Sequence, residues 1–421
     1  MNTRQIKILF MVLFSFWTCD GISQGKLIEI ANNASESCAR PQGLGVYHKG
    51  KTYVAYNGKN MDGYIKSYNH KTKLWSEEKK LFEMPVADYH DYPTIVIGND
   101  EKIHLFVSHH NRQLHYYRSP NSNSIEGEWE HQEWIPLHAT YTAPVVTPNG
   151  NIYVFFRKGI GNSKGSYILS TDNGDSWSKP IDIIDMDWDD FFNDRVYFGQ
   201  VKFKEAAGIY PDRILFNITL ADIKNKAHKD LYYLYLSIED GLLYNVEGEL
   251  IGEKMVTKEQ FNKAQVLDTK NSINNPILIR SFMVDVEKES GRPVMLYAFY
   301  DYNAGHYNSH HCFWNGEKWE FSLVKLKSHP RDIEVLGNNS VIAYVAARDD
   351  KSDTQCIAAV RSDDKGASWT TVTTYVAPEG NIRTYTLIDN YNHDIKAVIH
   401  NDYGPGWMYS GEGKIYVHGA K

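Results

Sequence analysis

Short runs of alternating hydrophobic and polar residues dominate this chain of 421 residues, while hydrophobic positions at helical spacing are scarce. Turns rich in Gly, Asn and Asp separate the runs, so the pattern predicts an all-β protein. The apolar runs 94–97 and 103–107 are one example. They flank the turn sequence GNDEK and should pair as a β-hairpin.

This predicted hairpin carries histidines at its open end. If its turn centres on Asp100, residues whose numbers sum to about 200 face each other, and His90 faces His110. The two imidazoles then either share a substrate, a proton or a metal, or form a chance pair at a wet sheet end. Because side chains alternate along a strand, only one of His109 and His110 can face the channel. The pairing with His90 favours His110.

The motif S-x-D-x-G-x-x-W occurs twice, as STDNGDSW at 170–177 and within RSDDKGASW at 361–369. A decayed copy, SIEDGLLY, occupies 237–244. This is the Asp-box, a hairpin turn between outer strands in many sugar-active propellers. Its Asp bonds turn amides, its Gly permits the turn, and its Trp packs underneath. The motif indicates a fold and says little about chemistry.

A looser unit recurs along the chain: an apolar inner strand, a turn, two more strands and an aromatic residue. The closing aromatics are Trp75, Trp129, Trp177, Tyr244, Trp319, Trp369 and Trp407. Each unit is long enough for a four-stranded blade. We therefore predict one seven-bladed β-propeller over 24–421, with an insertion at 245–270. The N-terminal segment 27–57 should close the ring against the C-terminal segment 380–418.

Residues 1–23 predict a secretory signal peptide. A positively charged start precedes the apolar stretch 8–17, which is too short to span a bilayer, and small residues precede a cleavage point after Ser23. We expect a protein that is secreted, periplasmic or held at the cell surface. A lipid anchor at Cys19 is the minor alternative. No later segment is apolar enough to be transmembrane, and the three remaining cysteines are too few for a disulfide framework.

The formal charge of -7 argues against a nucleic-acid partner, which would require a basic face. It does not exclude an acidic polymer as substrate, because a local basic cleft can lie in an acidic protein. We expect a monomer that binds an acidic polysaccharide.

The starts of three consecutive inner strands share a polar, aromatic position. HDYP (90–93) aligns with YTAP (141–144) and YFGQ (197–200), so this position holds His90, Tyr141 and Tyr197. For any one tyrosine the alternative is a cap at the start of an inner strand, since the chain contains 29 tyrosines. For the row beside His110 we favour a site.

Two arginines lie near this row. Counting from the turn TPNGN places Arg157 opposite Thr142, beside Tyr141. Arg213 follows Tyr197 on the next strand, but the irregular turn EAAGIYPD prevents the same counting. Either arginine is otherwise a surface residue or half of a local salt bridge.

These residue types favour a lyase over a hydrolase. Glycoside hydrolases generally use two carboxyl groups flanking the bond, and no facing pair is apparent here. A polysaccharide lyase removes the proton α to a uronate carboxylate, which a cation must neutralise, and it needs a base and an acid. His serves in either role, and Tyr serves when a nearby Arg lowers its pKa from about 10. No cofactor is required.

The segments H-x-Y-P … SHHN, YTAPVVTPNGNIYVFFRKG and YFGQ … PDRILF resemble the seven-bladed propeller lyases that degrade ulvan, a sulfated algal polymer of rhamnose and uronic acid. The resemblance covers most of the mature chain. It implies acid–base roles for His110 and Tyr197, and neutralisation of the uronate by Arg213, 16 residues after Tyr197. The residues that we expect to bind the substrate are His90, Asn111, Tyr141 and Arg157.

A second histidine cluster lies in HYNSHHCFWNG (306–316). Its candidate metal ligands are His310, His311, Cys312 and, later in the chain, His329. The resemblance allows a structural zinc or calcium ion there. The alternative is a polar outer strand with a buried thiol, because the spacing is not that of a standard zinc site.

Two rival functions stay open at this point. A sialidase-like glycoside hydrolase also uses Asp-boxes, but it would need an arginine triad and a Tyr–Glu pair. A non-catalytic sugar-binding propeller would keep the aromatics without requiring His110, Tyr197 and Arg213 to converge.

Overall fold

The computed structural model describes residues 23–35, 42–88, 90–159, 163–186, 194–222, 227–269, 279–301, 303–348, 355–378, 381–402 and 410–419. Almost all of the expected signal peptide, together with Cys19, Cys38 and Trp407, lies outside these residues. Among the described residues, strands predominate, with one α-helix and a short 3-10 turn at Lys59–Met61. Cys312 and Cys356 are buried free thiols.

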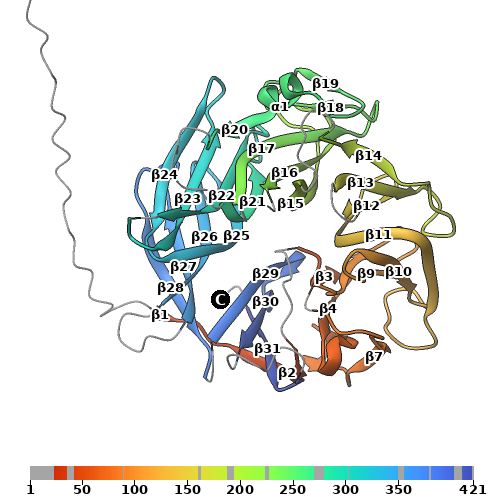
Figure 1. Ribbon diagram of the computed structural model, residues 1–421. Coiled ribbons are helices and arrows are strands. Elements are labelled where there is room, and N and C mark those ends of the chain that lie inside the picture. The colour runs from red at the N-terminus through yellow and green to blue at the C-terminus, as the bar shows by residue number, and fades with distance from the viewer. Residues whose placement is uncertain are drawn as a thin grey trace, which may run out of the picture.

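The strands form antiparallel sheets arranged radially around a common axis (Figure 1). In the first half of the chain the strands are β3 (Gly45–His48), β4 (Lys51–Asn57), β5 (Gly63–Asn69), β6 (Leu74–Trp75), β7 (Lys79–Phe82), β8 (Thr94–Ile97), β9 (Ile103–Ser108), β10 (Arg112–Arg118), β11 (Glu130–Val146), β12 (Ile152–Lys158), β13 (Lys164–Ser170) and β14 (Ile181–Ile184). The long strand β11 is shared: its start pairs with β10 and its end pairs with β12.

The next sheet contains β15 (Asp194–Lys204), β16 (Arg213–Asp222), β17 (Ala227–Ser237), β18 (Leu243–Tyr244), β19 (Leu250–Gly252) and β20 (Gln265–Leu267), with helix α1 (Lys258–Ala264). The last two of these strands and α1 fall in the segment 245–270, where the sequence predicts an insertion. Thr257 caps α1 with a capping box, because its side chain accepts from the Gln260 amide while the Gln260 side chain accepts from the Thr257 amide.

The second half of the chain completes the ring. Its strands are β21 (Ile279–Val286), β22 (Pro293–Asp301), β23 (His306–Trp314), β24 (Trp319–Lys325), β25 (Ser328–Gly337), β26 (Ser340–Arg348), β27 (Gln355–Ser362), β28 (Thr370–Val376), β29 (Asn381–Asn392), β30 (Ile395–Asp402) and β31 (Gly413–His418). The inner strands β3, β8, β11, β15, β21, β25 and β29 contact one another in chain order, and β29 returns to β3. This confirms an all-β propeller. The count of seven blades stays a prediction, which the ring of inner strands supports.

The two ends of the chain close the ring. Strand β2 (Ile28–Ala34) pairs with β31 as the outer strand of the last sheet, and β29 pairs in parallel with β3. Strand β1 (Ser23–Gln24) adds to β28. The predicted closure of 27–57 against 380–418 is therefore confirmed.

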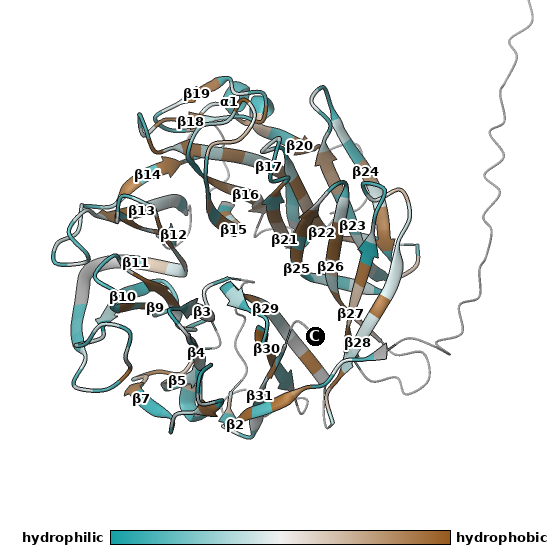
Figure 2. Ribbon diagram, turned by 180° about the vertical axis from the view of Figure 1, so that it is seen from behind, coloured by the Kyte–Doolittle hydropathy of each residue, from teal (hydrophilic) through white to brown (hydrophobic). Residues whose placement is uncertain are grey.

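The hydrophobic core lies between successive sheets. One cluster joins Phe155 and Ile184 to Phe198 and Phe216, and another joins Leu215 and Tyr233 to neighbouring sheet residues. Figure 2 shows the hydrophobic residues concentrated in the strands and the hydrophilic ones in the loops. Because each sheet buries both of its faces against neighbours, the loops at the strand ends carry the chemistry.

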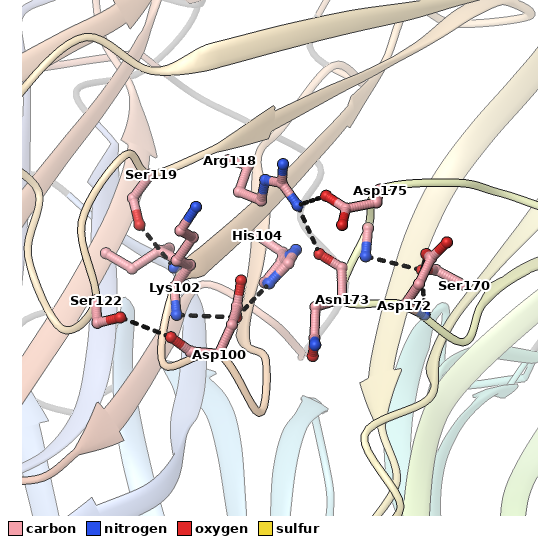
Figure 3. A network of polar contacts seen from close by, with 12 residues as sticks. Asp100, Lys102, His104, Arg118, Ser119, Ser122, Ser170, Asp172, Asn173 and Asp175 are labelled. Atoms are coloured by element: carbon pink, nitrogen blue, oxygen red, sulfur yellow. Dashed lines mark hydrogen bonds and ion pairs between the residues drawn. The ribbon is translucent and has the colours of Figure 1, made fainter.

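The two complete Asp-boxes adopt the expected turns between outer strands. In the first, the Asp172 carboxylate accepts a hydrogen bond from the Ser176 amide at 2.9 Å, and Ser170 Oγ accepts from the Gly174 amide at 2.8 Å. Arg118 reaches from β10 and donates to the turn carbonyl of Asn173 at 2.9 Å (Figure 3). The turn after β13 is therefore also tied to β10, beyond β11 and β12 in the same sheet.

The predicted hairpin register is confirmed. Thr94 pairs with Phe106 and Ile97 pairs with Ile103, so partner numbers sum to 200. The end of β9 and the segment before β8 therefore meet at one face of the propeller, which we call the upper face. The inner strands begin at this face.

Candidate active site

His90 and His110 lie face to face at the upper face. Their ring centroids are 3.9 Å apart, and the planes are tilted by 32°. His90 precedes β8 and His110 follows β9, so the confirmed register of the hairpin is what brings the rings together. His109 points elsewhere and stacks on His115 at 4.7 Å. The alternation of side chains therefore selects His110 as the partner of His90, as the sequence predicts.

Asp88 links the two imidazoles. Nδ1 of His90 donates to Asp88 Oδ1, and Nδ1 of His110 donates to Asp88 Oδ2 at 2.9 Å. Burial alone would raise the pKa of Asp88, but the hydrogen bonds from the His90 amide and from both imidazoles outweigh it and hold this pKa below its usual range. Because each Nδ1 faces Asp88, the nitrogen that either ring can use to exchange a proton with a substrate is Nε2.

Burial lowers the pKa of His90 to about 4, despite its hydrogen bond to Asp88. His90 is therefore neutral at physiological pH and is a weaker proton acceptor than an exposed histidine. Neighbouring Asp91 shows the opposite shift. Burial raises its pKa to about 8, although its Oδ1 accepts a hydrogen bond from the His110 amide at 2.6 Å.

Arg157 lies between two tyrosines. Its guanidinium carbon is 5.0 Å from the ring centroid of Tyr141 and 5.0 Å from that of Tyr197. The two tyrosine rings are themselves 5.7 Å apart, and Tyr141 also contacts His90 at 5.7 Å. The aromatic position shared by the three inner strands thus forms a continuous row of rings. The buried arginine supplies that row with a positive charge.

Tyr141 sits in an unusual backbone conformation, with φ of 62°. A bulge causes this: Thr140 pairs with Arg157 and Ala143 pairs with Phe155, leaving Tyr141 out of the ladder. Such a conformation is costly for a tyrosine and persists where the surroundings impose it, commonly at functional sites. The sequence count placed Arg157 opposite Thr142. The bulge shifts this partner to Thr140.

Asn111 positions Arg157. Its Oδ1 accepts a hydrogen bond from Arg157 Nη2 at 3.2 Å, and its amide donates to the Ala139 carbonyl at 3.1 Å. Asn111 has φ of 56°, a left-handed conformation that asparagine tolerates better than most residues. Asn111, which we expect to bind the substrate, therefore also holds Arg157 in position.

Arg213 does not join this cluster. It pairs with Lys204 at the opposite end of β15 from Tyr197, which pairs with Thr219. Its guanidinium donates to the Gly291 carbonyl at 2.7 Å and packs over Tyr210. The expected meeting of Arg213 with Tyr197 is wrong, because the long turn between β15 and β16 puts Arg213 at the far end of the sheet.

His228 is a site neighbour that the sequence reasoning missed. Its ring lies 4.7 Å from that of Tyr197, and Thr219 Oγ1 is 3.4 Å from its Nδ1. His228 comes near the start of β17, a third strand, whereas the sequence comparison of blades aligned only inner strands. A search for polar residues at the starts of third strands could have found it.

The expected metal ligands on β23 do not converge. His310 stacks on Tyr297 at 5.5 Å, while His311, its neighbour along the strand, faces Trp369 at 5.3 Å. Cys312 is buried in a hydrophobic cluster, and His329 packs on Tyr307. Adjacent strand residues point to opposite faces, so this sequence cluster is divided between two environments.

One trio within the described part of the chain has donor atoms close enough to hold a metal ion, namely Asp88, His90 and His110, with those atoms within 4.8 Å of one another. However, each Asp88 oxygen already accepts a hydrogen bond from an imidazole Nδ1. The trio is therefore satisfied as a proton network. Its imidazoles can act as a general base or acid.

The site thus combines two imidazoles, two phenol groups and a buried guanidinium. The nearby carboxyl groups of Asp88 and Asp91 accept hydrogen bonds from the Nδ1 and the backbone amide of His110, respectively. This arrangement can neutralise an anionic group and move a proton beside it. It does not offer the two opposed carboxyl groups that most glycosidases use.

A family model described as BNR repeat-containing family member matches residues 51–325. An ulvan lyase of Nonlabens ulvanivorans is 25% identical over 405 residues, covering 84% of this chain and 81% of that protein. The protein named Ulvan Lyase-PL25 of Pseudoalteromonas sp. (strain PLSV) is 27% identical over 312 residues, covering 65% of this chain and 62% of its own length.

Among solved structures, a PL25 ulvan lyase bound to -[GlcA(1-4)Rha3S]- superimposes with a TM-score of 0.80 at 20% identity, covering 94% of this chain and 96% of that one. This likeness supports the propeller fold. Within the part of the chain that the structure describes, no helix has the length and hydrophobicity needed to span a membrane.

Proposed function

The chain belongs to the BNR repeat-containing family, and from this membership, its lyase relatives and its site geometry we propose that it is a polysaccharide lyase that cleaves ulvan by β-elimination. The observation that carries the proposal is the position of Arg157 between Tyr141 and Tyr197, beside the His90–His110 pair. A cation, a phenol and an imidazole in contact are the groups that uronate elimination requires.

We assign the carboxylate-binding role to Arg157 rather than Arg213. In β-elimination the base removes the proton at C5 of the uronate, and the electron pair forms the C4=C5 double bond as the C4–O4 bond breaks. The carboxylate at C5 takes up the developing negative charge, so the cation must contact it. Arg157 lies at the upper face with the other site residues, whereas Arg213 is bonded to backbone carbonyls at the far end of its sheet.

Tyr141 is the base in this proposal. It contacts both the Arg157 guanidinium and the His90 ring, so it joins the cationic part of the site to the histidine pair. A guanidinium beside a phenol favours the phenolate form. Tyr197, to which the resemblance gives an acid–base role, contacts Arg157 and His228 and is the alternative base. Comparing phenylalanine variants of the two tyrosines separates these assignments.

His110 donates the proton that O4 takes up on leaving, and His90 assists it through their shared carboxylate, Asp88. The leaving oxygen must be protonated as the C4–O4 bond breaks, and an imidazole at hydrogen-bond reach supplies this. After release of the unsaturated product, solvent exchange returns the proton from the base to the acid. Atoms and charge balance without a cofactor.

We also propose that the protein is exported through the signal peptide at 1–23 and acts as a monomer. Export places the enzyme where a polymer too large to enter a cell can be cut. Size-exclusion chromatography with light scattering of the mature chain, and its detection in culture medium, test these two points.

The test of function is incubation of the mature protein with ulvan and a panel of other uronate polymers. The proposal expects ultraviolet absorbance from unsaturated uronate to rise with ulvan. New reducing ends without this absorbance would indicate a hydrolase of the sialidase-like kind. Binding to ulvan with neither product would indicate a non-catalytic sugar-binding propeller.

A further inference from the structure

A second hollow opens between the β21–β24 sheet and the β25–β28 sheet. Its polar and aromatic lining comes from Tyr300, His306, Tyr307, Lys327, His329 and Arg331. These residues lie at the end of β22, the start of β23, the turn before β25 and the start of β25 itself. None of them takes part in the candidate active site.

The hollow lies on the upper face, the face that carries the active site. Tyr300 pairs with Tyr307, and Asp301 with His306, where β22 ends and β23 begins. His110 likewise follows the end of β9, where β10 begins. Since each sheet is traversed from its inner to its outer strand, both places are at the same end of their sheets. Figure 1 places β25 and β26 across the ring from β9 and β10.

The hollow presents aromatic faces. The Tyr307 ring lies 4.9 Å from Tyr300 and 4.4 Å from His329. Each of these three side chains is partly exposed. Pockets for small polar molecules commonly combine such aromatic surfaces with a few placed polar groups, and an aromatic face suits the apolar C–H face of a sugar ring.

The hollow is also positively charged. Lys327 is exposed, and the turn that carries it is fixed by a hydrogen bond from its amide to Asn308 Oδ1 at 3.0 Å. Arg331 also lines the hollow. Burial lowers the pKa of His329 to about 3, and the charges of Arg331 and Arg280 add to this effect. The nearby carboxylate of Asp301 accepts hydrogen bonds from turn amides.

We infer that this hollow is a second polysaccharide subsite, which binds a sulfated sugar unit of the chain being cleaved, several units from the scissile bond. The identity of the polymer rests on the proposed function. The sulfate is held by Lys327 and Arg331, and the sugar ring packs on Tyr307. Cations at a partly exposed site suit a permanently charged sulfate group. The polymer would thus cross the upper face from the active site to the hollow between the β21–β24 and β25–β28 sheets.

The test compares wild type with the double variant Lys327→Gln, Arg331→Gln and with Tyr307→Leu. Each variant should raise KM for polymeric ulvan roughly 3- to 10-fold with kcat unchanged, because only remote contacts are lost. Kinetics on the shortest cleavable ulvan oligosaccharide should not change. Lys318→Gln, at the opposite end of the same sheet, is the matched control and should behave as wild type.

Unchanged KM for polymer in variants with wild-type melting temperatures would overturn the inference. So would an equal loss on polymer and on the short oligosaccharide, which would place the effect in the active site. The third comparison uses desulfated ulvan as the substrate. If the KM of the double variant still exceeds that of wild type on this substrate, the sulfate assignment is wrong.

Retardation of each protein in a native gel containing ulvan separates failure of this inference from failure of the proposed function. A wild-type protein that cleaves no polymer, yet is retarded more than the double variant, would contradict the lyase and support the subsite. A cleaving protein whose retardation is the same in both would contradict the subsite alone.

Discussion

The imidazole rings of His90 and His110 lie 3.9 Å apart, and each donates its Nδ1 proton to the same carboxylate. This shared acceptor fixes the orientation of both imidazole rings. Substitution of the acceptor should therefore disturb both rings at once, which makes Asp88 a positioning residue rather than a catalytic one.

Asp88→Asn should lower kcat by about 10- to 100-fold, as is usual when a group that orients a histidine is lost. An asparagine presents one acceptor and one donor, so it cannot accept from both imidazoles. The pH profile of kcat/KM should also move, because the tautomer of one ring is no longer fixed. A variant with lowered kcat and an unshifted profile would indicate a merely structural role.

His110→Asn should reduce kcat by roughly 10²–10⁴, the usual effect of losing an acid–base group. His109→Asn is the matched control, because His109 stacks on His115 and faces away from His90. It should retain turnover. A loss of activity in the His109 variant alone would contradict the assignment of the facing histidine.

Arg157→Lys should lower activity, whereas Arg213→Lys should lower stability. The first keeps the charge but loses the planar fork that binds a carboxylate, so kcat/KM should fall while the melting temperature changes little. The second should destabilise the fold by about 1–3 kcal/mol, because carbonyls of Gly291 and Pro211 lose a buried donor, while kcat stays near wild type. Kinetics and thermal unfolding of both variants check this. A loss of activity in Arg213→Lys together with a loss of stability in Arg157→Lys would instead place Arg213 in the active site.

Stability should depend on pH through Asp91. Its folded-state pKa is raised to about 8, whereas the unfolded chain has a value near 3.9, so the folded state binds more protons between these values. This contribution is fully present below about pH 4 and is lost as the pH rises towards 8. The melting temperature of wild type should fall from about pH 5 to pH 8, and that of Asp91→Asn should fall less. Equal slopes in the two proteins would contradict the burial of this carboxyl group.

Removal of metal ions should leave the elimination rate unchanged. Asp88 already accepts hydrogen bonds from both His90 and His110. In the proposed elimination Arg157 neutralises the uronate carboxylate, so no Lewis acid is required. Assay after dialysis against a chelator checks this. Loss of activity that zinc or calcium restores would show that the trio, or a site outside the described residues, binds a catalytic ion.

The sequence predicted the parts of the site that depend on local registers. The hairpin 94–107 has a compact turn, so counting across it places His90 against His110, and alternation excludes His109. The row of aromatics was also accessible, because the inner strands begin with aligned segments. The backbone conformation could not be predicted in this way, because no residue type in YTAP indicates the bulge or the positive φ of Tyr141.

The two Tyr–Arg pairs show why spacing alone misleads. Tyr141 precedes Arg157 by the same 16 residues that separate Tyr197 from Arg213. Between β11 and β12 the turn is short, and Arg157 returns to the level of Tyr141. Between β15 and β16 a longer strand and turn use up these residues, so Arg213 only begins the return strand. Loop length, which sequence spacing does not reveal, decides which arginine reaches the site.

The most direct test of the account is the turnover of Tyr141→Phe on ulvan, measured by the ultraviolet absorbance of unsaturated uronate beside Tyr197→Phe. The substitution removes one hydroxyl group, so the fold and the contact with Arg157 should survive. We predict that Tyr141→Phe lowers kcat by about 10²–10⁴ while Tyr197→Phe retains most of it. Near wild-type turnover of Tyr141→Phe, at an unchanged melting temperature, would contradict the account.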